Sequence, residues 1–328
     1  MNNSSNNSKR VILQTNNQND KEKEEDFIII DPTYPYMENK NQNEKENENL
    51  EKKFENSPYI LELEVINSSF LSNGTKIKID QFGLLEGSLR NAKDNITYFG
   101  YIENSDDKNI DKDNSLDYLL PFKHCEKLGR FFKIQYIPKL NEYIIKDLGN
   151  GLGTFIKIQD LIYIRDSQMI NIGDSYLIFY FIDSNEEINI NKSNENKNMN
   201  KKEDLNNIYG INHKLKIKLY DSKNNDEMKE FIFENNSEKT IHIGRKNHGN
   251  EIELNDHLSS KVNCIIQYNR ENGWIVKDGN EIILKDGDIK RNYSRNGTWF
   301  LAIENIKIVD KLIFKSNFNI FKCNLIKS

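Results

Sequence analysis

Short stretches in which apolar and polar residues alternate fill two regions of the chain, with Gly, Asn and Asp turns between them. In the first region, rich in Ile, Phe and Tyr, they comprise Ile60–Val65, Lys76–Asp80, Phe131–Ile137, Tyr143–Asp147, Thr154–Ile158 and Ser175–Ile182. In the second they comprise Lys214–Tyr220, Glu230–Glu234, Thr240–Gly244, Glu251–Asn255, Asn263–Tyr268, Gly273–Asp278, Thr298–Ile303 and Phe318–Ile326. A period of two predicts strands, and no convincing amphipathic helix accompanies them. We therefore expect an all-β protein with two successive β-sandwiches.

Two long polar segments lack this pattern. They are rich in Asn, Lys and Glu and hold too few apolar residues to offset the loss of chain entropy on folding. An apolar island, Phe27–Tyr36, interrupts the first and is either a sticky patch or a short docking segment. The expected organisation is a disordered tail over residues 1–55, a sandwich over 56–185, a linker over 186–209 and a sandwich over 210–328.

The charge distribution narrows the range of ligands. The chain has 328 residues and a net charge of −5, but residues 210–328 hold 20 Lys and Arg against 16 Asp and Glu, a net charge of +4. The remainder therefore carries −9. A mildly positive C-terminal region suits an anionic ligand, whereas +4 is too small to indicate nucleic acid.

The cysteines and the first residues indicate the compartment. Cys125, Cys264 and Cys323 are scattered, and the last two lie in apolar, strand-like runs, so we expect buried free thiols and no zinc site. The polar start has no secretory signal pattern, and no run approaches the roughly 18 apolar residues of a membrane helix. We expect an intracellular protein, cytoplasmic or nuclear, without membrane contact.

The two regions resemble each other. Asn141–Ile158 lines up with Asn272–Ile303, since each reads aromatic residue, apolar strand, Lys-Asp, glycine turn, Gly-Thr-aromatic and apolar strand. The second copy holds additional residues, Asn280 to Tyr293, inside the turn. One shared unit in each region indicates a duplicated domain.

Three short motifs follow one another in the second copy. They are IGRK at Ile243–Lys246, LSSKVNCII at Leu258–Ile266 and SRNGTW at Ser294–Trp299. Their order resembles the forkhead-associated (FHA) domain family, β-sandwiches that bind phosphothreonine peptides, whose motifs are Gly-Arg, Ser-Arg-x-His and Ser-x-Asn-Gly-Thr. The resemblance covers about 115 residues. It implies that the three motifs lie in loops at one end of the sandwich.

The resemblance also implies a phosphopeptide-binding site. Arg245 would donate charge-assisted hydrogen bonds to phosphate, and Asn296 would hold the peptide backbone, because an amide both donates and accepts. The serine of the motif would face the phosphate; we prefer Ser260, and Ser259 is the register alternative. The expected binding residues are Arg245, Lys246, Ser260, Lys261, Ser294 and Asn296, and the expected structural residues are Gly244, Asn263, Gly297 and Thr298.

The second copy departs from the family in two places. Asn263 replaces the family's histidine, which braces the binding loops, so we expect altered rigidity with binding retained. The end of the insertion and the two residues after it read KRNYSR, Lys290–Arg295, which adds three cations beside the expected site. This segment either enlarges the peptide-binding surface or forms a solvated loop.

The first copy carries a weaker version of the motifs. Tyr101 follows Gly100 where an arginine is expected, and Gly129-Arg130 replaces Ser-Arg. No asparagine stands two residues before Thr154. We interpret this copy as degenerate, structural or protein-binding, with Arg130 as its one residual phosphate contact.

Nothing in the sequence indicates catalysis. The chain has neither a phosphate-binding Gly-x-x-x-x-Gly-Lys loop nor a Gly-x-Ser-x-Gly nucleophile elbow. We expect no enzyme activity, cofactor or metal. The sequence favours a signalling adaptor that binds a phosphothreonine-containing protein through its second domain. The alternative is a phosphate-independent interaction scaffold made of two β-sandwiches.

Overall fold

The computed structural model describes residues 59–90, 92–102, 115–121, 129–183, 210–221, 228–235, 239–285 and 287–327. These residues form strands and turns and no helix, so the predicted all-β class is confirmed. It follows that the described ranges contain no helix able to cross a membrane. The predicted tail (1–55), linker (186–209) and Cys125 lie outside the described residues.

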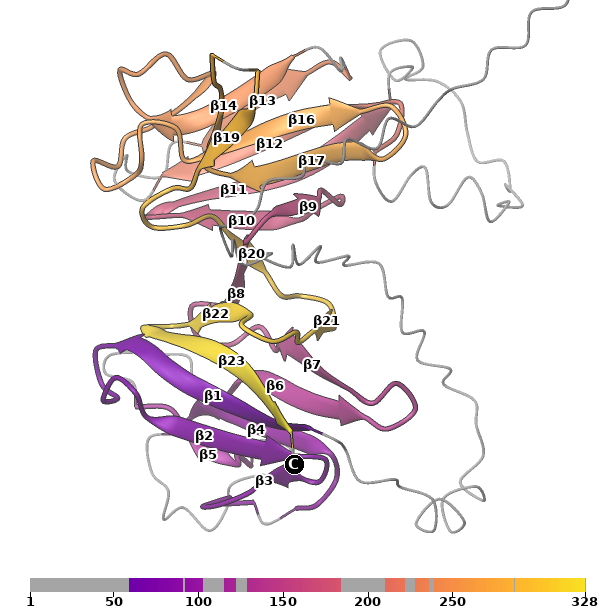
Figure 1. Cartoon of the computed structure of the whole chain (residues 1–328), viewed down its shortest axis with the longest axis vertical. Coiled ribbons are helices and arrows are strands. Elements are labelled where there is room, and N and C mark those ends of the chain that lie inside the picture. The colour runs from indigo at the N-terminus through magenta and orange to yellow at the C-terminus, as the bar shows by residue number, and fades with distance from the viewer. Residues whose placement is uncertain are drawn as a thin grey trace, which may run out of the picture.

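The strands form two lobes, drawn one above the other in Figure 1. The lower or first lobe contains β1 (Tyr59–Ser68), β2 (Lys76–Asp80), β3 (Gly83–Leu84), β4 (Ile96–Tyr101), β5 (Tyr118–Leu119), β6 (Gly129–Ile137), β7 (Glu142–Asp147), β21 (Ile306–Lys307), β22 (Ile313–Ser316) and β23 (Asn319–Lys327). The upper or second lobe contains β9 (Leu161–Tyr163), β10 (Met169–Ile172), β11 (Ser175–Asp183), β12 (His213–Asp221), β13 (Met228–Phe233), β14 (Thr240–Arg245), β15 (Ile252–Leu254), β16 (Cys264–Asn269), β17 (Gly273–Asp278), β18 (Asn280–Ile283) and β19 (Ile289–Asn292). The strands β8 (Thr154–Lys157) and β20 (Trp299–Leu301) join the lobes.

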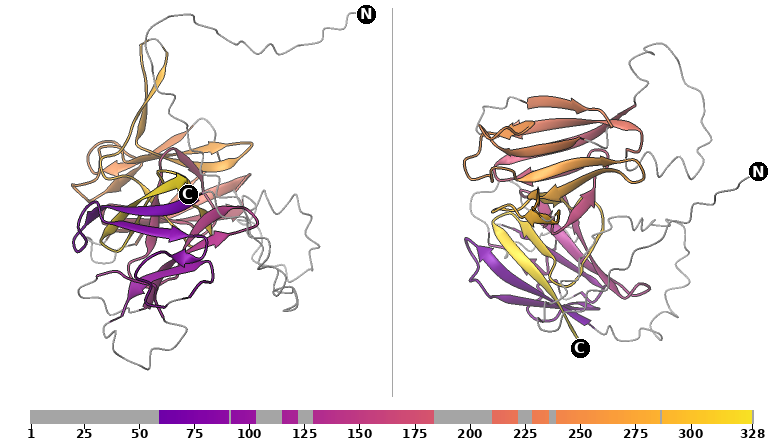
Figure 2. Two further views of the ribbon diagram at one scale, coloured as in Figure 1. Left: turned by 60° about the horizontal axis from the view of Figure 1, so that its bottom comes forward. Right: turned by 45° about the horizontal axis from the view of Figure 1, so that its top comes forward.

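One long sheet runs through both lobes. Its eleven strands have the order β13-β12-β11-β10-β20-β8-β22-β23-β1-β2-β3. A five-stranded sheet, β21-β7-β6-β4-β5, faces it in the first lobe, and another, β15-β14-β16-β17-β9, faces it in the second. Each lobe is therefore a two-layered sandwich, and Figure 2 shows the layers from two further directions. The β18–β19 hairpin, which is the insertion Asn280–Tyr293, projects from the body in its left view.

The strand pairing crosses the boundary expected between residues 185 and 210. β23 runs antiparallel to β1, with Cys323 opposite Leu63, and β11 runs antiparallel to β12, with Phe179 opposite Ile217. The last three strands of each repeat thus complete the lobe that the other repeat begins. The lobes therefore do not follow the division 56–185 and 210–328. Alternation tells which side of a strand is buried but not which neighbour covers its edge.

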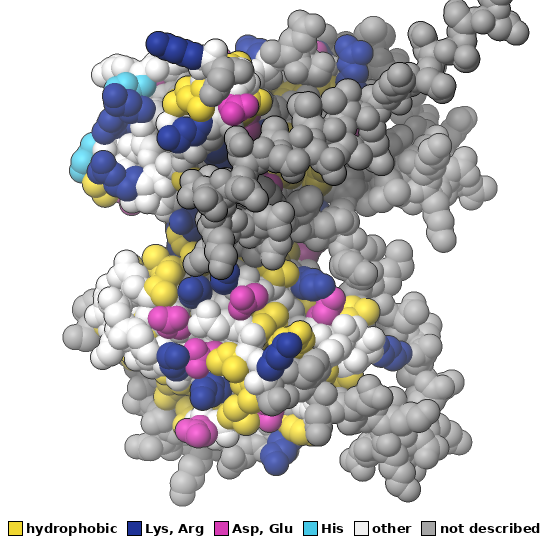
Figure 3. Space-filling model, in the orientation of Figure 1, with side chains coloured by type: hydrophobic (Ala, Val, Ile, Leu, Met, Phe, Trp, Pro, Cys, Tyr) yellow, Lys and Arg dark blue, Asp and Glu magenta, His cyan; other side chains and the backbone are white. Residues whose placement is uncertain are grey.

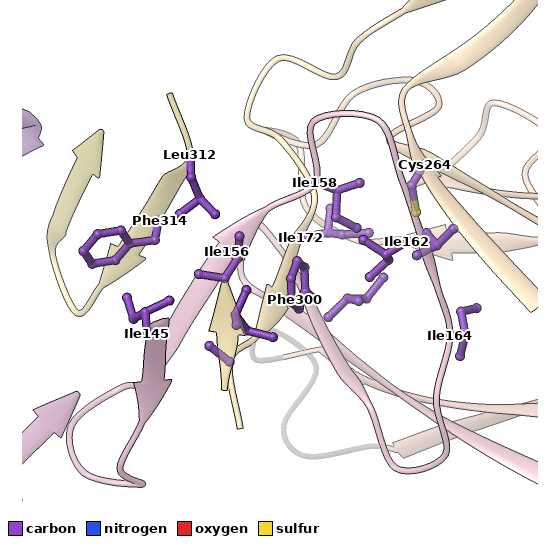
Figure 4. Packing of buried hydrophobic residues seen from close by; sticks show 14 of the residues in the cluster. Ile145, Ile156, Ile158, Ile162, Ile164, Ile172, Cys264, Phe300, Leu312 and Phe314 are labelled. Atoms are coloured by element: carbon purple, nitrogen blue, oxygen red, sulfur yellow. The ribbon is translucent and has the colours of Figure 1, made fainter. Parts of the chain in front are cut away.

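A continuous hydrophobic core joins the lobes. Figure 4 shows Ile156 on β8 and Phe300 on β20 at the junction, with Phe314 toward the first lobe and Ile162 toward the second. All four side chains are at most 1% exposed. Burying one such side chain contributes about 1.5–3 kcal/mol, so this shared core resists separation of the lobes.

The two described cysteines are buried free thiols, as predicted. Cys264 lies in the core of the second lobe, whereas Cys323 lies in that of the first. Burial raises the pKa of both thiols well above the ordinary value. They are therefore protonated at neutral pH and serve as small apolar side chains.

Candidate functional site

The three motifs of the second copy meet at one end of the second lobe. Arg245 ends β14, and its Nη1 donates a hydrogen bond to the carbonyl of His257 at 3.3 Å. Asn296 Nδ2 donates to the carbonyl of Leu258 at 2.9 Å. Ser260 Oγ accepts a hydrogen bond from the backbone N–H of Arg295, also at 2.9 Å. We call this meeting point of residues 245–251, 255–263 and 293–298 the loop end.

The two serines of the middle motif have different environments. Ser259 is 3% exposed, and its hydroxyl donates to the carbonyl of Asp256 at 2.6 Å. Ser260 is half-buried and its hydroxyl lies between two of the loops. Ser259 is therefore used inside the loop, and Ser260 is the serine that a ligand can reach.

Asn263 is the fully buried base of the loop end and contacts two of its loops. Its Oδ1 accepts from the backbone N–H of Ser260 at 3.3 Å, and its Nδ2 donates to Thr298 Oγ1 at 3.1 Å and to the carbonyl of Gly297 at 3.5 Å. A single amide thus ties the middle motif to the Asn-Gly turn, in the position where the FHA resemblance implied a brace.

A buried carboxylate supports the same turn from below. Asp278 Oδ1 accepts from the hydroxyls of Ser294 at 2.6 Å and Thr298 at 2.7 Å, and Oδ2 accepts from the backbone N–H of Ser294 at 3.1 Å. Burial raises the pKa of the Asp278 carboxyl, against the opposing effect of these hydrogen bonds. Ser294, expected to bind peptide, is 7% exposed and uses its hydroxyl inside the protein.

Two glycines are required at the loop end, one by a close backbone contact and the other by its backbone conformation. A Cβ on Gly244 would lie 2.2 Å from the carbonyl oxygen of Lys261, so the loop packs directly on the backbone there. Gly297 has φ of +77°, a conformation that residues with a side chain rarely adopt. A glycine is therefore favoured at both positions, as in the Gly-Arg and Asn-Gly motifs.

Two further residues complete the framework of the site. Asn250 Nδ2 donates to the carbonyls of Arg245 at 3.0 Å and Lys261 at 2.8 Å, and so ties the first motif to the second. Sequence analysis missed Asn250 because nothing in its surroundings marks it. Asp278 was also missed, although the Lys-Asp pair recurs in both copies and was a usable signal.

The surface of the loop end is basic. Lys246 and Lys261 are exposed, as are His248 and His257. Figure 3 shows blue and cyan side chains together at the left of the upper lobe, where Figure 1 places the loops around β14. Within the described ranges, Arg245 forms no ion pair with a carboxylate, so its charge is available to an anion.

The insertion contributes less charge to this surface than its composition suggests. Arg291 forms an ion pair with Asp160, which fixes the β18–β19 hairpin to the body, and another across the hairpin with Glu281 of β18. Lys290 is exposed on β19. Arg295 belongs to the loop end and also lines a groove between the lobes. The segment is therefore an anchored hairpin, with Arg295 as the cation adjacent to the expected site.

The equivalent end of the first lobe is arranged differently. Arg130 Nε donates to the carbonyl of Ser115 at 3.0 Å, and the guanidinium lies 3.7 Å from the centre of the Tyr98 ring. A Cβ on Gly100 would lie 2.1 Å from the carbonyl oxygen of Gly129, as at Gly244 in the second lobe. The close backbone packing is thus shared, whereas Arg130 is engaged by its own lobe.

No family model, curated protein or solved structure matches the chain. Among the described residues, no group of three or more His, Cys, Asp or Glu side chains is placed to hold a metal ion.

Proposed function

We propose that the chain binds phosphothreonine-containing proteins through the loop end of the second lobe and acts as a signalling adaptor. The observation that carries this proposal is the convergence of Arg245, Ser260 and Asn296, which come from three separate loops. Sheet packing alone has no need of an arginine, a reachable serine and an exposed amide at one end of a sandwich.

The chemistry of these groups fits a phosphorylated peptide. The Arg245 guanidinium presents donors that match the three oxygens of a phosphate, and Ser260 adds a hydroxyl. Asn296 is exposed and offers both a donor and an acceptor to a peptide backbone. The exposed Lys246 and Lys261 add positive charge, which accelerates the approach of an anion. The resemblance to FHA domains points to the same ligand.

The full chain is the correct material for the test. Residues 210–328 alone lack β9, β10 and β11, which belong to the second lobe, and retain β21, β22 and β23, which belong to the first. Such a fragment would expose unpaired strand edges and the apolar faces that these strands cover. We therefore expect the fragment to aggregate.

The test is a fluorescence-anisotropy titration of the full chain with a library of labelled peptides that carry phosphothreonine, phosphoserine or unmodified threonine. We expect saturable binding of phosphothreonine peptides. Arg245→Ala should weaken it about ten- to a hundred-fold, because hydrogen bonds to charged groups contribute about 1.5–3 kcal/mol. The matched control is Arg270→Ala, an exposed arginine in the β16–β17 turn, which should leave affinity unchanged. Equal affinity for the phosphorylated and the unmodified peptides would refute the proposal.

A second candidate function rests on a different surface. A groove of about 470 Å³ beside the glycine turn 149–153 of the first copy is lined mainly by apolar side chains, among them Leu152, Phe155 and Tyr220. Leu152 is 50% exposed and Tyr220 is 39% exposed. This surface favours a phosphate-independent scaffold, and the same titration decides between the two, since a scaffold interface would bind unmodified peptides as well and resist salt.

A further inference from the structure

A second groove, of about 440 Å³, lies between the lobes beside the loop end. Arg295 and Asn296 line it on one side, and Lys157 of β8 and Lys315 of β22 line it on another. Its apolar part comes from Trp299 together with isoleucines of β1, β22 and β23. The groove exists because β22 pairs with β8, which brings strands of both repeats to one place.

Lys315 carries a charge in partly apolar surroundings. Its Nζ lies 4.8 Å from the centre of the Trp299 ring and 5.4 Å from that of Phe155, and it donates a hydrogen bond to Asn171 Oδ1. Burial lowers its pKa to about 8, so the amine is still mostly protonated at neutral pH. Ring faces and an amide stabilise an ammonium only partly, and an anion would complete its environment.

Two more cations, Lys157 and Arg295, line the groove beside Lys315. The stem of Lys157 passes close to Gly297, and its charge acts on the buried Asp278. Within the described parts of the chain, neither Lys157 nor Lys315 forms an ion pair. Asp174, in the turn between β10 and β11, is the carboxylate that lines the groove against these cations and Arg295. The groove is therefore positive overall.

The groove and the loop end form one continuous surface. The backbone N–H of Arg295 contacts Ser260 in the loop end, while Arg295 also lines the groove. Asn296 likewise belongs to both, since its amide contacts Leu258 and its carbonyl accepts from Trp299 Nε1 at 2.9 Å. A peptide held at the loop end by its phosphate would continue into the groove within a few residues.

We infer that the groove binds a second anionic side chain of the same phosphothreonine peptide, through Lys157, Lys315 and Arg295. This inference rests on the proposed function. The anion is a carboxylate of Asp or Glu or a second phosphate, and Trp299 and the isoleucines contact the apolar part of that side chain or its neighbour. The specificity of the second lobe would thus depend on β22, a strand that folds into the first lobe.

The test compares three phosphothreonine peptides with the full chain by fluorescence anisotropy. One has neutral flanking residues, the second has Asp and Glu in their place, and the third has a flanking phosphoserine. We expect both anionic peptides to bind about tenfold more tightly than the neutral one. Lys315→Met should remove this advantage and leave affinity for the neutral peptide unchanged. Lys157→Met, on a different strand, should act in the same direction.

The matched control is Lys322→Met on β23, a half-buried lysine that does not line the groove. It should preserve the preference for anionic peptides. Equal affinity for all three peptides, or a preference that survives both groove variants, would overturn the inference and leave the proposed function intact. Failure of every phosphopeptide to bind would overturn the proposed function and the inference with it. A preference for only one anionic peptide that both groove variants abolish would also support the inference, and it would identify the anion as carboxylate or phosphate.

Discussion

Ile156 lies opposite Phe300 in the antiparallel pairing of β8 with β20, although the two residues occupy equivalent positions in the two copies of the repeat. The next strand on either side also pairs through equivalent residues. Phe300 pairs with Ile170, and Ile156 pairs with Phe314. The long sheet is thus approximately symmetric about this pair. Each copy crosses here into the other lobe, and the exchange of C-terminal strands is reciprocal.

The exchange can be tested with one added thiol. Cys323 forms its backbone hydrogen bonds with Lys311 and Leu312, on the side away from β1, so Leu63 and Cys323 are a non-hydrogen-bonded pair. Such pairs have Cα atoms about 4.5 Å apart, which suits a disulfide. In a background of Cys125→Ser and Cys264→Ala, Leu63→Cys should form a disulfide with Cys323 after mild oxidation, detected by peptide mass mapping.

The control for this cross-link is Ile217→Cys in the same background. Ile217 is the residue of β12 that corresponds to Leu63, and it is equally buried. If each copy kept its own strands, Cys323 would lie opposite Ile217. A disulfide in the Ile217→Cys variant and none in Leu63→Cys would show that the strands are not exchanged.

Asn263→Ala should destabilise the protein and weaken phosphopeptide binding together. The substitution leaves the buried hydroxyl of Thr298 and the N–H of Ser260 each without one partner. We expect the free energy of unfolding to fall by about 1–3 kcal/mol, measured by urea denaturation. Asn272→Ala, at an exposed turn, is the control and should change it by less than about 0.5 kcal/mol. Unchanged stability in Asn263→Ala would show that the amide is no brace.

Gly244→Ala and Gly100→Ala should separate stability from binding. Each introduces a Cβ within 2.2 Å of a backbone carbonyl oxygen, one in each lobe. Both should lower the free energy of unfolding by about 1–3 kcal/mol, since the backbone must shift. Gly244→Ala moves the loop that carries Ser260, whereas Gly100→Ala does not. When both variants are measured under conditions in which they are folded, Gly244→Ala should weaken peptide binding and Gly100→Ala should not. Equal loss of binding in both variants would argue against a site at the loop end.

Asp278 should make stability fall as pH rises. Its pKa in the folded protein is above the ordinary value of 3.8, because burial disfavours the charged form. From pH 3.8 up to the folded pKa, the native state holds a proton that the unfolded state has lost, so the free energy of unfolding decreases. Asp278→Asn removes this titrating carboxyl. Relative to the unmodified protein, the variant should therefore gain stability with rising pH over this window, in urea titrations at a series of pH values.

Glu230→Gln provides a control of opposite sign. Glu230 is exposed, and its pKa is lowered first by the hydrogen bond from Lys216 and also by Lys218. The folded protein therefore favours the charged form of Glu230, and this preference stabilises the fold. The stabilisation is fully present above pH 4.5, the ordinary pKa, and is lost as the pH falls through the lower pKa of the folded protein. Glu230→Gln should lose stability relative to the unmodified protein as pH rises. The same pH trend in both variants would contradict the assignment of Asp278.

Much of the local structure could be read from the sequence. Alternation of apolar and polar residues predicted the longer strands, including Lys76–Asp80 and Gly273–Asp278 with the bounds that the structure gives. It also predicted the burial of Cys264 and Cys323. The two-residue strands β3, β5 and β21 were missed, because two residues carry no periodic signal. The strands β4, β9, β10, β18, β19 and β22 were also absent from the prediction, and all of them except the six-residue β4 have only three or four residues.

The loop end was predictable in part. Motif order identified Arg245, Ser260 and Asn296, and the structure brings the three together. It could not show that Ser294 turns inward to Asp278, since a serine in a turn suits either a ligand or a buried carboxylate equally well. The groove residues Lys157 and Lys315 carried no signal, because each reads as the polar position of an alternating strand.

The sequence by itself therefore determined the all-β class, most of the longer strands with their buried faces, and which loops carry polar chemistry. Only the tertiary structure decided which strands pair. Ile170 and Phe314 are both apolar and equivalent in the repeat, so β8 and β20 could each pair with either strand without exposing an apolar face. The choice depends on the connections after β8 and β20 and on the packing of the whole core, which no local pattern records.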